Sequence, residues 1–249
     1  MKRVIIIILG LCLVSCDSEN ALDCFQRTGG IIRQEVEVAD FTRILVNPNV
    51  ELILKEGEVA SVVIETGDNL LDEVSAAVEG DRLVLSNSND CNFVRDFNQT
   101  KVFVTSPNIT EIRSETQFDI SSDGVLGYPS LRLLSEDFNE DNGGNITGTF
   151  IMELDNESLS VVGNNIASFF VKGKVTELYV GFFSGTGRFD GAELISEHVE
   201  ILHRGTNKII VNPQQSIKGE IRSTGDVISV NTPPIIEVDE FFTGRLIFN

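Results

Sequence analysis

The side chains best suited to chemistry are few and widely spaced. The two histidines, His198 and His203, lie five residues apart, a spacing that directs two side chains of one strand to opposite faces. Residues 137–143 carry oxygen ligands as calcium loops do, but Asn142 and Gly148 stand where such a loop needs glycine and a bidentate glutamate. A solvated acidic loop is therefore favoured over a loose Ca²⁺ site. Motifs of serine hydrolases, phosphate-binding loops and zinc peptidases are absent from the sequence. We expect no catalytic residue, no metal ion and no cofactor.

Cys16 is the residue whose surroundings most clearly predict a covalent modification. It ends a Leu-Val-Ser-Cys tetrapeptide, which closes an apolar run that begins after Lys2 and Arg3. The run is shorter than the about 20 residues that cross a bilayer core, so residues 1–15 are predicted to be a signal peptide rather than part of the fold. The leader resembles those of bacterial lipoproteins, which implies cleavage before Cys16 and lipid on its sulfur and new amino terminus. The alternative is an ordinary signal with a chance cysteine.

The residues after Cys16 bear on location. Asp17, Ser18 and Glu19 follow it. Acidic residues here resemble the export tags that send some Gram-negative lipoproteins to the cell surface, whereas in other lineages an aspartate at this position resembles an inner-membrane retention signal. We expect an outer-membrane lipoprotein of a Gram-negative cell envelope, held to the membrane by its lipid anchor, with surface exposure as one alternative.

The charge balance excludes one class of partner. The chain has 38 acidic and 19 basic residues, and loss of the leader with its two basic residues leaves 17 basic residues and a formal charge of −21. Binding to nucleic acid depends on Lys and Arg that neutralise phosphates, so no nucleic-acid partner is expected. Solubility alone is the favoured explanation of such acidity, with a role in binding as the alternative.

Two cysteines remain once Cys12 leaves with the leader and Cys16 carries lipid. Cys24 and Cys91 would lie in an oxidising compartment, where two leftover thiols are disulfide candidates. Closing a loop of this length stabilises a fold by about 4 kcal/mol in the chain-entropy model.

Strand patterns dominate the chain. Short β-branched runs separated by Gly, Asn, Asp and Ser predict strands, which are placed at 41–46, 50–54, 61–65, 82–85 and 101–105. Only residues 69–78 have helical spacing, enough for one or two turns. Residues 16–35 are predicted to be the lipidated cysteine and a polar tether, and residues 36–249 the folded domain.

A repeat is visible from about residue 110. Each unit has an apolar strand, a turn built on Gly or Asn, one polar residue and an outgoing apolar residue. The outgoing residues are Ile120, Ile146, Ile166, Phe189, Ile209, Val227 and Leu246. A period near 20 without a helix predicts an all-β solenoid in which these residues stack about 4.8 Å apart, with Gly and Asn supplying positive φ at the corners. A sandwich of antiparallel hairpins is the alternative, and residues 36–110 would continue the solenoid or cap it.

The succession of motifs resembles a known family. The motifs are Phe41-x-x-Ile44-x-Val46, Val63-x-Glu65, Leu83-x-Leu85, Asp90-Cys91-Asn92-Phe93-Val94-Arg95, Ser223-Thr224-Gly225-Asp226-Val227 and Thr243-Gly244-Arg245-Leu246. They are similar to those of the head-GIN domain family of auto-transporter adhesins, common as lipoproteins of Gram-negative envelopes, over about residues 36–249. The resemblance implies a right-handed parallel β-helix and supplies no catalytic residue. Lys208 departs from the acidic or amide residue that the family places after a turn.

Three phenylalanine doublets suggest a contact surface. Neighbouring residues of a strand point to opposite faces, so one ring of each doublet is expected to leave the core; these rings are Phe170, Phe183 and Phe242. Rings that align across coils would form an apolar stripe for a partner, a lipid or a second copy. The alternative is that the N-terminal half covers this face.

These features favour a non-enzymatic cell-envelope lipoprotein, an adhesin-like or structural binding module whose ligand the sequence does not identify. One alternative is a carrier of lipid or another apolar ligand, which needs a cavity. Another is a polysaccharide-active enzyme on the same scaffold, which needs clustered Lys or Arg. The segment 246–249, in which three apolar residues precede Asn249, also predicts a homodimer formed through that end of the stack.

Overall fold

The computed structural model describes residues 23–96, 99–137 and 147–249. Regular structure in these ranges is β-strand apart from two short 3-10 turns, η1 (Asp23–Phe25) and η2 (Leu71–Glu73), and the seventeen strands form one hydrogen-bonded sheet. The all-β class predicted from the sequence is confirmed. The strands are β1 (Ile31–Val36), β2 (Arg43–Val46), β3 (Glu51–Glu56), β4 (Ser61–Gly67), β5 (Val74–Glu79), β6 (Arg82–Asn87), β7 (Lys101–Ser106), β8 (Glu111–Ser114), β9 (Ile120–Leu126), β10 (Ser130–Ser135), β11 (Thr149–Gly163), β12 (Ser168–Phe182), β13 (Arg188–His203), β14 (Ile209–Ile221), β15 (Val227–Ser229), β16 (Ile235–Glu240) and β17 (Leu246–Phe248).

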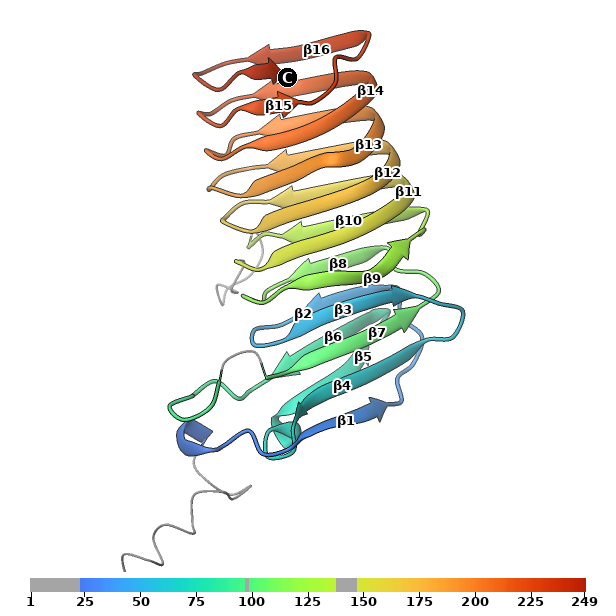
Figure 1. The fold of residues 1–249 in the computed structure, drawn as a ribbon, viewed down its shortest axis with the longest axis vertical. Helices are drawn as coiled ribbons and strands as arrows, with labels where there is room; N and C mark the ends of the chain where they lie inside the picture. Colours follow the sequence, from blue (N-terminus) through green and yellow to red (C-terminus); the bar gives the residue numbers. More distant parts are fainter. Residues whose placement is uncertain (1–22, 97–98, 138–146) are drawn as a thin grey trace, which may run out of the picture.

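The strands lie in layers along the long axis of the molecule, with β1 near one end and β15 to β17 at the other (Figure 1). From β10 to β14 each strand pairs in parallel with the next strand of the sequence. Parallel pairing continues from β11 through β9 to β3, and from β10 through β8 to β2. The N-terminal portion is therefore continuous with the stack, and it adds antiparallel pairs among β1, β4 and β7 and between β5 and β6.

One row of buried apolar side chains runs through the layers, and we call it the inner row. In register order it contains Leu52, Ile120, Phe150, Phe169, Phe189, Ile209, Val227 and Leu246. Every member except Leu246 is fully buried. The rings of Phe150 and Phe169 are stacked with centroids 4.8 Å apart, a distance that matches the spacing of neighbouring strands. Each layer thus covers the apolar side chain of the next.

Five of the seven outgoing residues predicted from the repeat belong to the inner row. The prediction is wrong for Ile166, which is 48% exposed in the corner before β12, while Phe169 fills the row. This corner buries Ala167 instead, so the strand resumes three residues later than the repeat suggests. Ile146 lies outside the described residues, and Phe150 occupies the layer expected for it.

Glycines recur at the corners chiefly because successive corners approach closely, and the expected positive φ is found at the corner residue Gly185 (φ 80°) but not at every corner. Neither Gly225 nor Gly244 has a positive φ. A Cβ atom on Gly225 would lie 2.2 Å from the carbonyl oxygen of Asn207, and one on Gly244 would lie 2.2 Å from that of Gly225. Both distances are far inside van der Waals contact, so the stack itself requires glycine at these positions.

Two local expectations are corrected in the N-terminal portion. Residues 69–78 contain the single turn η2 and most of β5 rather than a helix, because β5 pairs with β6 from Val74 to Glu79. The expected tether is folded from Asp23 onward, because β1 pairs with β4 along all of Ile31–Val36. In both places hydrogen bonds with another strand, the hairpin partner β6 in the first and β4 in the second, decide a conformation that the local pattern leaves open.

Candidate binding surface

A second row of side chains lies beside the inner row on the outer face of the sheet, and we call it the outer row. In register order it contains Val63, Phe103, Ile53, Ser121, Ile151, Phe170, Asp190, Ile210, Ile228 and Ile247. Alternation along each strand directs these side chains away from the buried ones. Only Ser121 and Asp190 interrupt its apolar character. With strands about 4.8 Å apart, the row is about 43 Å long.

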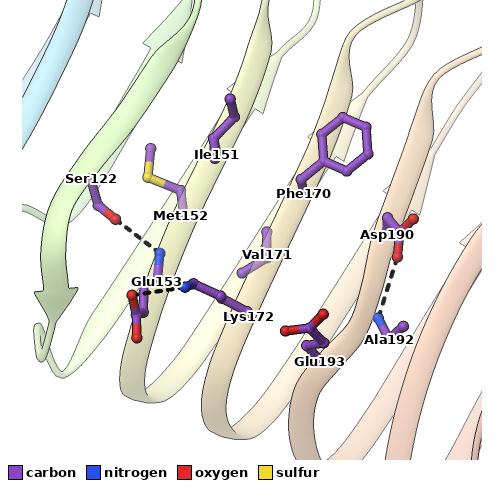
Figure 2. A pocket seen from close by; sticks show the side chains of 10 residues that line it. All are labelled: Ser122, Ile151, Met152, Glu153, Phe170, Val171, Lys172, Asp190, Ala192 and Glu193. Atoms are coloured by element: carbon purple, nitrogen blue, oxygen red, sulfur yellow. Dashed lines mark hydrogen bonds and ion pairs between the residues drawn. The ribbon is translucent and has the colours of Figure 1, made fainter.

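The middle of the outer row is the floor of a groove of about 400 Å³. Figure 2 shows Ile151 and Met152 on β11 beside Phe170 and Val171 on β12. Ile151 and Phe170 are register partners, and they are 46% and 38% exposed. The volume falls in the range of about 300–1,000 Å³ typical of small-molecule sites.

Extra residues on the two flanking strands form the walls of this groove. On one side β9 places residues 122–124 opposite Met152 of β11, and on the other β13 places residues 191–193 opposite two residues of β12. Ser122 from the first insertion and Glu193 from the second line the groove (Figure 2). Such bulges re-aim side chains and are frequent beside functional sites. The walls form because β9 and β13 have more residues than β11 and β12 between the same register partners.

Ion pairs occupy the rim of the groove. The Lys172 Nζ atom lies 3.1 Å from the Glu153 carboxylate, and the Arg188 guanidinium lies 2.6 Å from that of Asp190. Glu193 has no ion-pair partner within the described ranges. The rim therefore has one more carboxylate than cations.

An arginine covers the aromatic ring at two places along the outer row. The guanidinium carbon of Arg188 is 5.3 Å from the centroid of the Phe170 ring. That of Arg33 is 5.0 Å from the centroid of Phe103, and Arg33 is held by Glu65 at 2.6 Å. Phe103 lines a second groove, of about 230 Å³, on the N-terminal part of the same row. The outer row thus contains two grooves, and in each of them an arginine covers a phenylalanine ring.

Of the three rings predicted to form a stripe, only Phe170 lies in the outer row. Phe183 is half-buried directly after β12, where its N–H donates to the carbonyl oxygen of Gly163 at 2.9 Å. Phe242 is 60% exposed in the turn after β16. The three rings occupy different register positions, so they do not align with one another.

The aliphatic members of the outer row were not predicted from the sequence. Ile210, Ile228 and Ile247 each directly follow an outgoing residue of the repeat and pair in register with one another. The available signal was the second apolar residue of each repeat. Neighbours in a strand point to opposite faces, so such apolar pairs predict one buried and one outward side chain per layer.

The predicted disulfide between Cys24 and Cys91 is present. Beside it the N–H of Phe93 donates to the carbonyl oxygen of Cys24 at 3.0 Å, and the rings of Phe25 and Phe93 lie 5.7 Å apart. Cys16 and most of the predicted acidic loop lie outside the described residues. Within the described ranges, no helix is long and apolar enough to cross a membrane.

The groups whose pKa is displaced do not line the groove. Hydrogen bonds from Arg43 and Arg222 lower the pKa of the carboxyls of Asp81 and Glu220, and burial raises the pKa of Tyr128. Active sites gather such groups in one cleft, whereas Asp81 lies in the turn between β5 and β6, Tyr128 in the loop between β9 and β10, and Glu220 on β14. No three His, Cys, Asp or Glu side chains come together as a metal site in the described parts of the chain.

His203 is the most deeply buried titratable group of the stack. Its Nε2 lies 2.9 Å from the carbonyl oxygen of Asn207, which only accepts hydrogen bonds, so Nε2 carries the proton. Its buried Nδ1 has no hydrogen-bond partner. Burial lowers the pKa of His203 despite the attraction of Asp226. His198 is half-buried, with Nδ1 2.9 Å from the Ser216 hydroxyl.

We expect the fold to lose stability in mild acid through His203. Because the folded-state pKa lies below the ordinary value of 6.5, the stabilisation is complete above that pH and is lost as the pH falls below it. The slope approaches about 1.4 kcal/mol per pH unit for one proton. Urea unfolding between about pH 7.5 and pH 5.5 measures it. His203→Leu should flatten the profile and His198→Leu should preserve it; equal slopes in the two variants would refute this assignment.

The stacked parallel strands, with one buried and one outward row, define a repetitive all-β protein that offers a long face for contact. Residues 40–233 match the family described as "Putative auto-transporter adhesin, head GIN domain". The chain belongs to this family, as its motifs predicted. No curated protein matches the sequence.

Solved structures share the fold at low sequence identity. A "putative adhesin" from Bacteroides fragilis has a TM-score of 0.78 at 19% identity, covering 90% of this chain and 99% of that one. A "Putative lipid binding protein" from Parabacteroides distasonis has a TM-score of 0.62 at 14% identity, covering 90% and 98%. A "putative adhesin" from the same species has a TM-score of 0.64 at 13% identity, covering 90% and 99%.

Proposed function

We propose that the protein is a non-enzymatic binding module of the bacterial cell envelope and that the outer row is its contact surface. The observation that carries the proposal is the length of this outward row, from Val63 to Ile247, which is apolar at every position except Ser121 and Asp190. Contiguous apolar surface on a soluble body marks sites of interaction. Membership in a family described as adhesins supports the same role.

The proposed location rests on the leader. Lipid on Cys16 would hold the body that begins at Asp23 at the outer membrane, either in the periplasm or at the cell surface. Incorporation of a labelled fatty acid, abolished in Cys16→Ala, tests the anchor. Proteolysis of intact cells separates the two orientations.

The proposed architecture is a right-handed parallel β-helix. Support comes from the parallel pairing of β10 to β14, from the inner row that links successive layers, and from the similar solved structures. This form explains why the binding face is long and straight, since each coil adds one outward side chain to it.

A carrier of lipid or another apolar ligand is the second candidate function. The groove of about 400 Å³ favours it, as does the description of one solved structure of similar fold. A polysaccharide-active enzyme has less support, because Lys172 and Arg188 at the groove are already paired with carboxylates.

Arrays of defined glycans, lipids and matrix proteins test the binding role with the full chain. We expect at least one ligand class to bind, and the double variant Ile210→Ser/Ile228→Ser to weaken that binding by about tenfold or more. Phe242→Ser is the matched control, because this exposed ring lies outside the outer row. If the double variant bound as tightly as the native protein, or if an arrayed glycan were turned over, the proposal would be contradicted.

A homodimer through the β16–β17 end of the stack is a separate proposal. Exposed apolar side chains there include Ile235, Ile236 and Phe248. Sedimentation as a monomer at tens of micromolar would count against it.

A further inference from the structure

We propose that the groove on the outer row binds a single-chain amphiphile with a cationic head group. The alkyl chain would lie on Ile151 and Phe170, and the head would lie beside Glu193. This inference rests on the proposed function and names a ligand class for one part of the outer row.

The floor of the groove suits an alkyl chain. Ile151 and Phe170 present their side chains outward and supply the apolar surface of the floor, whereas Met152 and Val171 also line the groove but are only 2% and 3% exposed. Complete burial of one methylene raises affinity about fourfold. An open groove covers only one side of the alkyl chain, so each methylene should contribute about half of that free energy. Affinity should therefore rise steadily with chain length.

The charges on the rim favour a cationic head. Lys172 is neutralised by Glu153, and Arg188 by Asp190. Glu193, on the bulge of β13, is the rim carboxylate that takes part in neither pair (Figure 2). An ammonium group beside Glu193 gains an ion pair without displacing either existing one, whereas a sulfate or phosphate head would be repelled by Glu193 and would have to break an existing pair to reach a cation.

The floor strands disfavour an extended peptide as the ligand. Peptides that add to a sheet need a strand edge with free backbone groups. Both β11 and β12 are paired with strands on either side, so their backbone groups are engaged. What remains for a ligand is side-chain surface, which an alkyl chain covers without needing hydrogen bonds.

A photoreactive dodecylamine tests the proposal on the full chain in isolated envelopes. The probe carries a diazirine on its chain and is used below its micelle concentration, beside matched probes with a hydroxyl or a sulfate head. Labelled residues are located by mass spectrometry and normalised to labelling at Phe93, an exposed ring outside the outer row. We expect the amine probe to label residues 151–172 at least about fivefold more than the sulfate probe, and dodecylamine to compete about tenfold better than octylamine.

Variants separate the contributions of chain and head. Glu193→Gln should lower the amine-to-hydroxyl labelling ratio about fivefold and leave the hydroxyl probe unchanged. Phe170→Ser should weaken labelling by all three probes, and Phe242→Ser should change none of them. A retained Cys24–Cys91 disulfide and resistance to protease verify the fold of each variant.

Three results would overturn the inference: equal labelling whatever the head group, labelling at Phe93 as strong as in the groove, or better competition by an apolar lysine-containing peptide than by dodecylamine. The outcome is distinguishable from that of the proposed function. If the groove does not label but Ile210→Ser/Ile228→Ser still weakens array binding, only this inference fails. If the groove labels and the double variant has no effect on the arrays, the outer row as a general contact surface fails.

Discussion

Phe169→Ala should lower the free energy of unfolding by about 3–5 kcal/mol, as expected for removal of a fully buried ring. Phe169 is completely buried in the inner row, stacked on Phe150 at 4.8 Å and 6.0 Å from the ring of Phe182. The cavity would open between two layers whose strands are fixed by hydrogen bonds, so little collapse can compensate. Urea unfolding with a constant m-value measures the loss.

The adjacent residue provides the matched control. Phe170→Ala removes the same atoms from the outer row, where the ring is 38% exposed and contacts Arg188. Its cost should be about 1 kcal/mol or less. Equal costs for the two neighbours would mean that the inner and outer faces are not as described.

Loss of the Cys24–Cys91 bond should destabilise the protein by about 4 kcal/mol in the chain-entropy model, because the bond closes a separation of 67 residues. The bond holds η1 against the segment after β6, where Arg95 also donates to the carbonyl oxygen of Gln26 at 3.2 Å. The change is the double variant Cys24→Ser/Cys91→Ser, and the measurement is urea unfolding followed by circular dichroism.

Reductant supplies the control for the disulfide. Dithiothreitol should destabilise the native protein to the level of the double variant and should leave the variant itself unchanged. If reductant left the unfolding midpoint of the native protein unchanged, the bond would contribute little to the stability of the fold.

The repeat was readable from the sequence because burial and strand alternation leave a local signature. Ile209, Val227 and Leu246 each follow a Gly or Asn corner, and each stacks as predicted. Ile166 escaped the rule because its corner buries Ala167 first. A corner of different length changes which residue enters the inner row, although the apolar pattern of the sequence is almost unchanged.

The groove could not be predicted from a local pattern as the repeat could, since its walls are residues that one strand has in excess of its pairing partner. Residues 122–124 and 191–193 are extra only relative to the strands that pair with them, and pairing partners are not visible in one sequence. The outer row could have been recognised from apolar pairs such as Ile209-Ile210. The doublets group Phe183 and Phe242 with Phe170, because a doublet shows that neighbouring residues point to opposite faces but not where the strand ends.

Hydroxyl-radical footprinting of the full chain, with and without the ligand that it binds on the arrays, tests the central claim most directly. We expect Ile151, Phe170 and Ile210 to be oxidised less when ligand is bound, whereas Phe93 and Phe242 should react equally in both states. Protection at those two rings with an unprotected outer row would contradict the account.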